Sequence, residues 1–109
     1  MRVLIFVFLL CSFSVNAAKL KGHVSGLVAY ETGGRKILLF KLNNSTSKGC
    51  NTTARFAFDQ SKVNFDLMSS TILSAYHAKT PVEVNYDETC NIWGNSFDAR
   101  FICLGDIPC

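Results

Sequence analysis

Apolar and polar positions alternate along the first part of the chain, which is the pattern of β-strands. From residue 20 to residue 30 every second position is apolar or a glycine. The segment Thr32-Gly33-Gly34 interrupts this pattern, and RKILLFKL follows it. Residues 20 to 42 therefore predict a long hairpin, with Gly22 and Gly26 where the first strand curls.

The polar segment NNSTSKGCNTT predicts a loop, and ARFAF after it predicts a short third strand with Phe56 and Phe58 on one face. After Asp59 the apolar spacing changes to three and four residues, which predicts a helix between Ser61 and Lys79. Asp59 or Ser61 is expected to cap its start, and Thr80-Pro81 is expected to end it. Its apolar stripe is formed by Phe65, Met68, Ile72 and Tyr76.

Two further alternating segments close the chain. PVEVNY predicts a fourth strand and SFDARFICL a fifth, the latter with four positions in phase, namely Phe97, Ala99, Phe101 and Cys103. Three strands, one helix and two strands is the order of a mainly β fold of the OB type. We therefore expect a five-stranded, OB-fold-like Greek-key barrel with one helix between strands 3 and 4. A split α+β sheet is the alternative.

The first residues predict export. Arg2 precedes an apolar run from Val3 to Phe13, and Val15-Asn16-Ala17 offers a small-x-small cleavage site. This order is typical of a Sec signal peptide over residues 1–17, and the run is shorter than the ~20 residues of a membrane span. Cys11 lacks the small preceding residue of a lipoprotein signal. The alternative is a retained N-terminal anchor.

Residues 18–109 are then one OB-fold-like domain, secreted or periplasmic, without a membrane span. Removing residues 1–17 takes away Arg2 alone among the charged residues and lowers the formal charge of +3 by one. Such a weak and dispersed charge does not favour nucleic acid as a partner.

Four of the five cysteines lie in this domain, and an even number in a small exported domain favours disulfides. Cys103 and Cys109 bracket the turn-forming LGDIP and can meet locally, which leaves Cys50 for Cys90, although three pairings are possible. A zinc site is the rival interpretation. No C-x-x-C pair exists, and both histidines are far from the cysteines in sequence.

The segment TCNIWGN contains the only tryptophan of the chain, Trp93. An indole can stack on the apolar side of a sugar, the Asn95 amide can bond paired hydroxyls, and Gly94 allows close approach of a ligand. The competing hypothesis is that Trp93 closes one end of the barrel against a Cys50–Cys90 bridge. No cofactor, metal or catalytic motif is apparent, so we do not expect an enzyme.

The segment ILSAYHAKTPVEVNYDETCNIWGN resembles the helix, fourth strand and loop of pentamer-forming B subunits of bacterial AB-type toxins. CLGDIPC is similar to the cysteine pair that ends the subtilase-cytotoxin and pertussis-like type. The resemblance covers residues 50 to 109. It implies an OB-fold protomer in a homo-oligomeric ring, possible partnership with an enzymatic toxin subunit, and a cell-surface glycan bound on rim loops. Trp93 and Asn95 match the Trp-x-Asn of the cholera-like type, except that Trp93 follows Cys90 by three residues instead of two.

Two functions follow from the sequence. The first is an exported glycan-binding module resembling a toxin delivery subunit. The second is a non-catalytic structural or protein-interaction domain of the envelope or periplasm. The helix segment SSTILS fits either a solvated surface or the wall of a wet pore in a ring.

Overall fold

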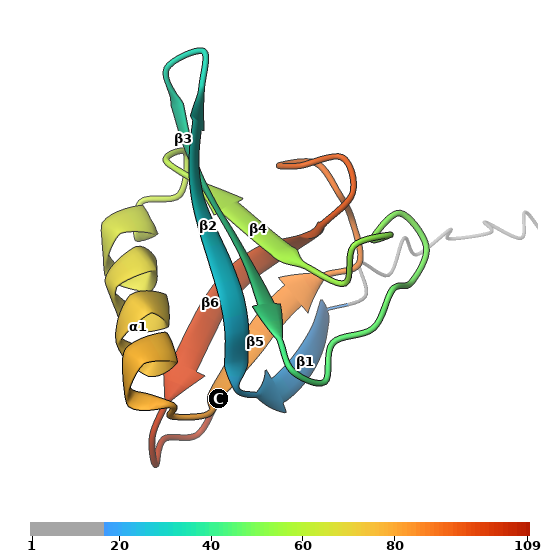
Figure 1. Cartoon of the computed structure of the whole chain (residues 1–109). Coiled ribbons are helices and arrows are strands. Elements are labelled where there is room, and N and C mark those ends of the chain that lie inside the picture. Colours follow the sequence, from blue (N-terminus) through green and yellow to red (C-terminus); the bar gives the residue numbers. More distant parts are fainter. Residues whose placement is uncertain (1–16) are drawn as a thin grey trace, which may run out of the picture.

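The computed structural model describes residues 17–109, which contain six strands and one helix (Figure 1). The predicted signal peptide lies outside the described residues, except for its last residue, Ala17. The fold is mainly β, as predicted, and the helix lies at the expected place in the order. The elements are β1 (Ala17–Gly22), β2 (Val24–Thr32), β3 (Arg35–Leu42), β4 (Phe56–Asp59), α1 (Phe65–Ala78), β5 (Val82–Asp87) and β6 (Phe97–Leu104).

The first strand expected from the alternation is two strands, which separate at His23. The break is fixed by Asn43, whose Oδ1 accepts from the His23 backbone N–H at 3.0 Å and whose own N–H donates to the His23 carbonyl at 2.9 Å. Next to it, Asn44 Nδ2 donates to the Lys21 carbonyl at 2.7 Å. A Cβ on Gly22 would lie 2.2 Å from Asn44 Oδ1, so any larger residue here would have to displace the Asn44 side chain.

The two halves of the broken strand pair with different partners. β1 pairs antiparallel with β5 and β2 pairs antiparallel with β3, so the order across the sheet is β1-β5-β6-β4-β3-β2. β4 and β6 are parallel, with Phe56 beside Phe97. The expected closed, five-stranded barrel is thus an open, mixed sheet of six strands. Because His23 alone separates the two edge strands, the sheet must curl strongly to bring its edges together.

The main core lies between the concave side of this sheet and α1. Its largest fully buried side chains include three phenylalanines of β3 and β4, Phe40, Phe56 and Phe58, which meet Ile72 of the helix. Removing each such side chain from water stabilises the fold by ~1.5–3 kcal/mol. The face predicted for Phe56 and Phe58 of β4 is therefore the face that the structure buries.

The helix starts later than the sequence predicts. It begins at Phe65, and its N-cap Asn64 makes no side-chain capping bond, so neither Asp59 nor Ser61 is its cap. Asp59 is instead buried at the end of β4, where it binds other donors. Helix α1 ends at Ala78, and its C-cap residue Lys79 has φ 55° and donates its N–H to the Ala75 carbonyl. The buried stripe ends on Ala75, whereas Tyr76 is 47% exposed.

A β-bulge changes the face of the last strand. Opposite β5, the partner steps from Phe101 to Ala99 between Asn85 and Tyr86, which leaves Arg100 as the extra residue. Phe97 and Ala99 are therefore buried as predicted, but Phe101 turns outward and is 42% exposed. Ile102 packs against the core in its place.

Candidate functional site

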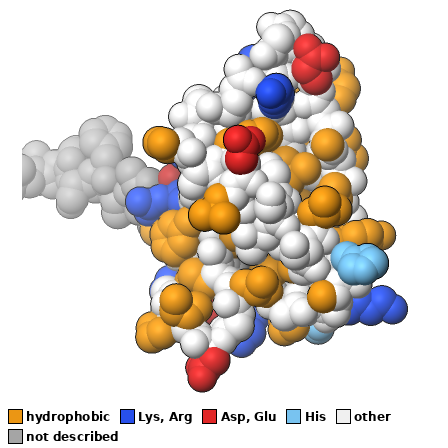
Figure 2. All heavy atoms as spheres, turned by 90° about the vertical axis from the view of Figure 1, so that its left-hand side faces the viewer, with side chains coloured by type: hydrophobic (Ala, Val, Ile, Leu, Met, Phe, Trp, Pro, Cys, Tyr) orange, Lys and Arg blue, Asp and Glu red, His pale blue; other side chains and the backbone are white. Residues whose placement is uncertain are grey.

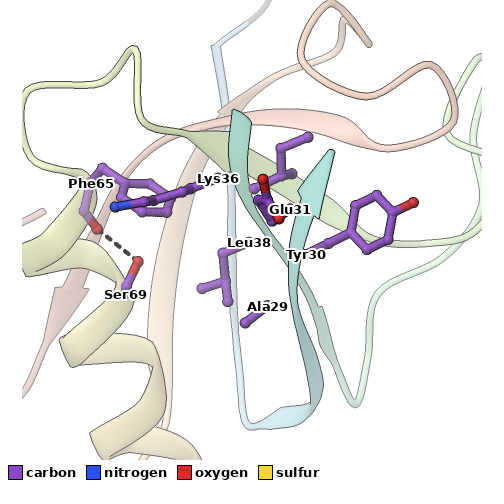
Figure 3. Close-up of a pocket in the computed structure, with 8 residues that line it drawn as sticks. Ala29, Tyr30, Glu31, Lys36, Leu38, Phe65 and Ser69 are labelled. Atoms are coloured by element: carbon purple, nitrogen blue, oxygen red, sulfur yellow. Dashed lines mark hydrogen bonds between the residues drawn. The ribbon is translucent and has the colours of Figure 1, made fainter. Parts of the chain in front are cut away.

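The convex side of β2, β3 and β4 carries a second, smaller set of side chains. Ile37, Leu39 and Ala57 are buried there, separately from the main core. Register places Tyr30 of β2 beside Ile37, and Figure 3 shows Tyr30 pointing away from the helix. We call this side the outer face, and it comprises Gly26, Val28, Tyr30, Ile37, Leu39, Lys41, Arg55, Ala57 and Asp59.

Trp93 covers part of the outer face. It is half-buried against the cluster of Ile37, Leu39 and Ala57. Its ring centroid lies 5.5 Å from that of Tyr30, at an interplanar angle of 78°. Tyr30 is 46% exposed, so the two rings form an edge-to-face pair that is partly open to solvent.

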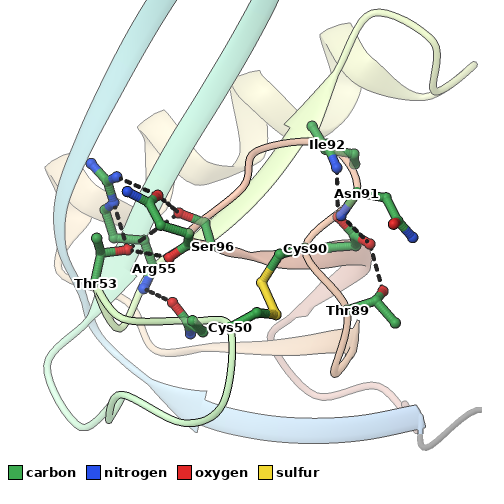
Figure 4. The surroundings of a disulfide bond; sticks show 11 residues. Cys50, Thr53, Arg55, Thr89, Cys90, Asn91, Ile92 and Ser96 are labelled. Atoms are coloured by element: carbon green, nitrogen blue, oxygen red, sulfur yellow. Dashed lines mark hydrogen bonds between the residues drawn. A yellow bond between two sulfur atoms is a disulfide. The ribbon is translucent and has the colours of Figure 1, made fainter.

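The loop between β5 and β6 holds Trp93 in place through the buried carboxylate of Asp98. Oδ1 of Asp98 accepts the backbone N–H groups of Asn91 and Ile92, both at 2.9 Å, and Oδ2 accepts the Thr89 hydroxyl (Figure 4). Ser96 N–H donates to the Trp93 carbonyl at 3.1 Å. A carboxylate with several donors is strongly bound, so this loop has a fixed shape.

A disulfide joins this loop to the loop before β4. Cys50 is bonded to Cys90 and Cys103 to Cys109, which is the pairing that the sequence analysis favoured. Figure 4 shows the Cys50–Cys90 bridge between the two loops. The ion pair of Lys48 with Glu88, at 2.9 Å, spans the same loops.

Asn95 is bound to Arg55 across the same two loops. Arg55 Nη2 donates to Asn95 Oδ1 at 3.0 Å, and Arg55 Nε donates to Thr53 Oγ1 at 3.0 Å. Thr53 in turn donates to the Asn95 carbonyl at 2.8 Å. The Asn95 side-chain oxygen is thus engaged, while its Nδ2 makes no hydrogen bond within residues 17–109. The position of the Arg55 guanidinium depends on Asn95.

A groove of about 260 Å³ runs along the outer face beside this network. The side chains of Lys41, Arg55 and Leu39 line it, and Gly26 leaves space where another residue would place a side chain. The groove therefore combines an apolar floor with two cations. Trp93 packs on the same face, against the cluster of Ile37, Leu39 and Ala57.

Comparisons with protein-family models, characterised proteins and solved structures find no match. The resemblance to toxin B subunits therefore stays a prediction from the sequence. What the site does chemically has to be argued from its geometry.

Arg35 and Asp59 form an ion pair at the other end of the outer face. Arg35 Nη2 lies 2.8 Å from Asp59 Oδ2 and also donates to the Ile92 carbonyl at 3.2 Å. Burial raises the pKa of Asp59, but the hydrogen bonds from Ser61 and Arg35 outweigh this effect and hold the pKa below its usual range. Asp59 is thus a charged structural group that fixes the Trp93 loop through Arg35.

The helix side of the molecule has two further hollows. One, of about 340 Å³, lies between the β2–β3 hairpin and the start of α1, where Leu38 faces Phe65 and Ser69 (Figure 3). The other, of about 460 Å³, is bordered by both histidines, His23 and His77. Within residues 17–109 no group of His, Cys, Asp and Glu could hold a metal, and no helix is long and apolar enough to cross a membrane.

The sequence predicts Trp93 and Asn95 as binding residues, which stays a prediction. The structure adds three candidates on the outer face that the sequence analysis did not name, Tyr30, Lys41 and Arg55. The alternation from residue 20 to residue 30 predicts that Tyr30 shares a face with Val24, but the register shift after Val24 places the two on opposite faces of the sheet. Arg55 precedes a buried strand and carries no local signal. The alternation of RKILLFKL does place Lys41 opposite the core, which was the available indication.

Proposed function

We propose that this protein is an exported, non-catalytic module that binds glycans on its outer face. The observation that carries the proposal is the Tyr30–Trp93 pair, two partly exposed rings on a rigid support. Aromatic rings of this kind offer an apolar surface to the C–H side of a sugar. Asn95 Nδ2 and the cations of the groove supply hydrogen-bond donors beside them.

The strand connectivity supports the proposal through the OB fold. If β1 and β2 are taken as one long, bent first strand, then β3 to β6 are strands two to five, and strands three and five, β4 and β6, pair in parallel. Small barrels of this type bind oligosaccharides and oligonucleotides on strands two and three, between the loops that follow strands one and four. Those loops here are the turn after Thr32 and the loop that carries Trp93.

A glycan-array screen of the oxidised protein, followed by titration of the glycans that bind, tests the function. Trp93→Ala should abolish binding and cost less stability than the ~3–5 kcal/mol of a fully buried aromatic. Asn95→Ala should weaken binding by roughly tenfold, because it removes a donor and releases Arg55. The emission maximum of Trp93 should shift to the blue when the glycan binds.

Tyrosine provides a matched control. Tyr30 on the outer face and Tyr76 on the helix side are 46% and 47% exposed. Tyr30→Ala should weaken glycan binding, whereas Tyr76→Ala should leave it unchanged. Equal losses in the two variants, or wild-type protein that binds no glycan, would favour the alternative function, a structural or protein-interaction domain.

We also propose that the protein self-associates, as the expected ring requires. Figure 2 shows hydrophobic side chains spread over the side of the molecule formed by α1. Val63, Leu67 and Leu73 are more than half exposed there, and a second copy would remove them from water. Light scattering at micromolar concentration should give about five protomers. A strict monomer would rule out the pentamer and would not affect the proposal of a glycan site.

A further inference from the structure

We infer that Lys41, Arg55 and Gly26 form a subsite for a tetrahedral oxyanion, and that the glycan on the outer face carries a sulfate ester there. The inference rests on the proposed glycan binding for the sugar itself. The subsite follows from separate observations, which concern charge and space in the groove of about 260 Å³.

Two cations, Lys41 and Arg55, line the same groove. β3 and β4 pair in the register Ile37 with Asp59 to Phe40 with Phe56, and Arg55 directly precedes β4, so extending this register by one step brings Arg55 opposite Lys41. Residues opposite one another in an antiparallel pair have Cβ atoms about 5 Å apart, and like charges at such positions destabilise the sheet. A bound anion would relieve this repulsion.

No carboxylate of the described residues neutralises these two cations. The ion pairs in residues 17–109 are Arg35–Asp59, Lys48–Glu88 and Arg100–Asp87. On the outer face itself, Asp59 is already bound by Arg35 and Ser61. The positive charge of the groove is therefore available to a ligand.

Arg55 is held so that part of its guanidinium remains free. Nε and one hydrogen of Nη2 are used by Thr53 and Asn95, which leaves Nη1 and the second Nη2 hydrogen for the groove. Together with the Lys41 ammonium, these donors approach from two strands. A planar carboxylate offers two oxygens, whereas a sulfate ester offers three terminal oxygens and fits two separate donor groups better.

Gly26 provides the space. It is the third position of the same cross-strand row, beside Lys41 in the register of β2 and β3. A Cβ added to Gly26 would meet no atom within 4 Å, so the glycine is not required by packing inside the protein. Its absent side chain leaves this part of the groove open.

The test compares two ligands that differ only in sulfate, a chondroitin sulfate tetrasaccharide and the unsulfated chondroitin tetrasaccharide, both of which carry carboxylates. The sulfated ligand should bind at least about tenfold more tightly, since one additional charge-assisted hydrogen bond is worth that much. Lys41→Gln should remove this preference, because it should weaken the sulfated ligand by at least about tenfold and the unsulfated ligand by much less. Lys41→Arg should restore it.

Two more variants separate the subsite from general charge effects. Gly26→Val fills the groove without changing charge and should also remove the preference. Lys79→Gln removes one charge from the exposed C-cap of α1, on the helix side of the molecule, and should change nothing. If Lys79→Gln weakens sulfated ligands as much as Lys41→Gln, the preference is a bulk charge effect and the inference is wrong.

Failure of the subsite and failure of the glycan function give different results. Equal affinity for both tetrasaccharides, lost in Trp93→Ala, would keep the function and overturn the subsite. The opposite result would be that no glycan binds, while inorganic sulfate shifts the amide signals of Gly26 and Lys41 in wild type but not in Lys41→Gln. That result would keep the subsite and overturn the glycan function. Tighter binding of single-stranded DNA than of the sulfated tetrasaccharide would overturn the sulfate assignment.

Discussion

Loss of the Cys50–Cys90 bridge should destabilise this domain more than loss of Cys103–Cys109. The two bridges span sequence separations of 40 and 6 residues. In the chain-entropy model a bridge restricts the unfolded chain, and these separations correspond to roughly 4 and about 2 kcal/mol. The difference of about 2 kcal/mol is large beside the ~5–15 kcal/mol of a typical domain.

The packing of the cysteines acts in the same direction. Cys90 contacts the main core, so Cys90→Ala also removes apolar contact there. At the other bridge, Asn85 Nδ2 donates to Cys109 Sγ at 3.2 Å, a single weak bond near the end of the chain. The paired variants Cys50→Ala/Cys90→Ala and Cys103→Ala/Cys109→Ala should therefore differ by at least the entropic amount.

Urea denaturation of the three proteins, followed by circular dichroism, measures these free energies. The variant without the long bridge should unfold at the lower urea concentration and with a steeper dependence on urea, because its unfolded chain is less compact. If the variant that lacks Cys103–Cys109 is as unstable as the variant that lacks Cys50–Cys90, or less stable than it, loop entropy does not govern the stability of this domain.

Three further predictions follow from single residues. Because the Asp59 pKa is lowered on folding, its stabilisation is complete above the unfolded pKa of ~3.9 and disappears as pH falls through the folded pKa. Wild type and Asp59→Asn should therefore converge in melting temperature at low pH, and a constant gap would contradict this. In urea unfolding, Phe97→Ala should lower the free energy of unfolding by ~3–5 kcal/mol and Phe101→Ala by under ~1 kcal/mol. Equal losses would show that the bulge does not turn Phe101 outward. Gly22→Ala should cost about 1 kcal/mol by displacing Asn44 from its bond to the Lys21 carbonyl, and an unchanged melting curve would show that the loop adapts freely.

Local pattern predicted the elements because each has a periodicity that short windows of sequence reveal. The breaks inside strands were not predictable in this way. The end of β1 at His23 depends on Asn43, which is distant in sequence, and the bulge at Arg100 depends on pairing with β5. The alternation of apolar and polar residues continues through both points in the sequence. Only tertiary contacts therefore change the face of the sheet to which the following side chains point.

The candidate site was predictable to a similar extent. Trp93 was identified because a single tryptophan beside glycine and asparagine is a local signal. Its packing partner Tyr30 and the cation Arg55 come from separate strands, and the curled sheet brings them to one face. The direct contact of Asn95 with a ligand stays a prediction, whereas the structure shows that its Oδ1 accepts a hydrogen bond from Arg55.

The break at His23 has a consequence for the order of folding. β2 pairs with β3 across a tight turn, Thr32 beside Arg35, and such hairpins form in about 1–10 μs. β1 pairs Ala17 with Asp87, so its partner strand is not available until most of the chain is in place. Closing so long a loop is slow. We therefore expect β2 to become ordered early in folding and β1 late, although the two strands are continuous in sequence. β1 should be among the last segments to gain protection from hydrogen exchange.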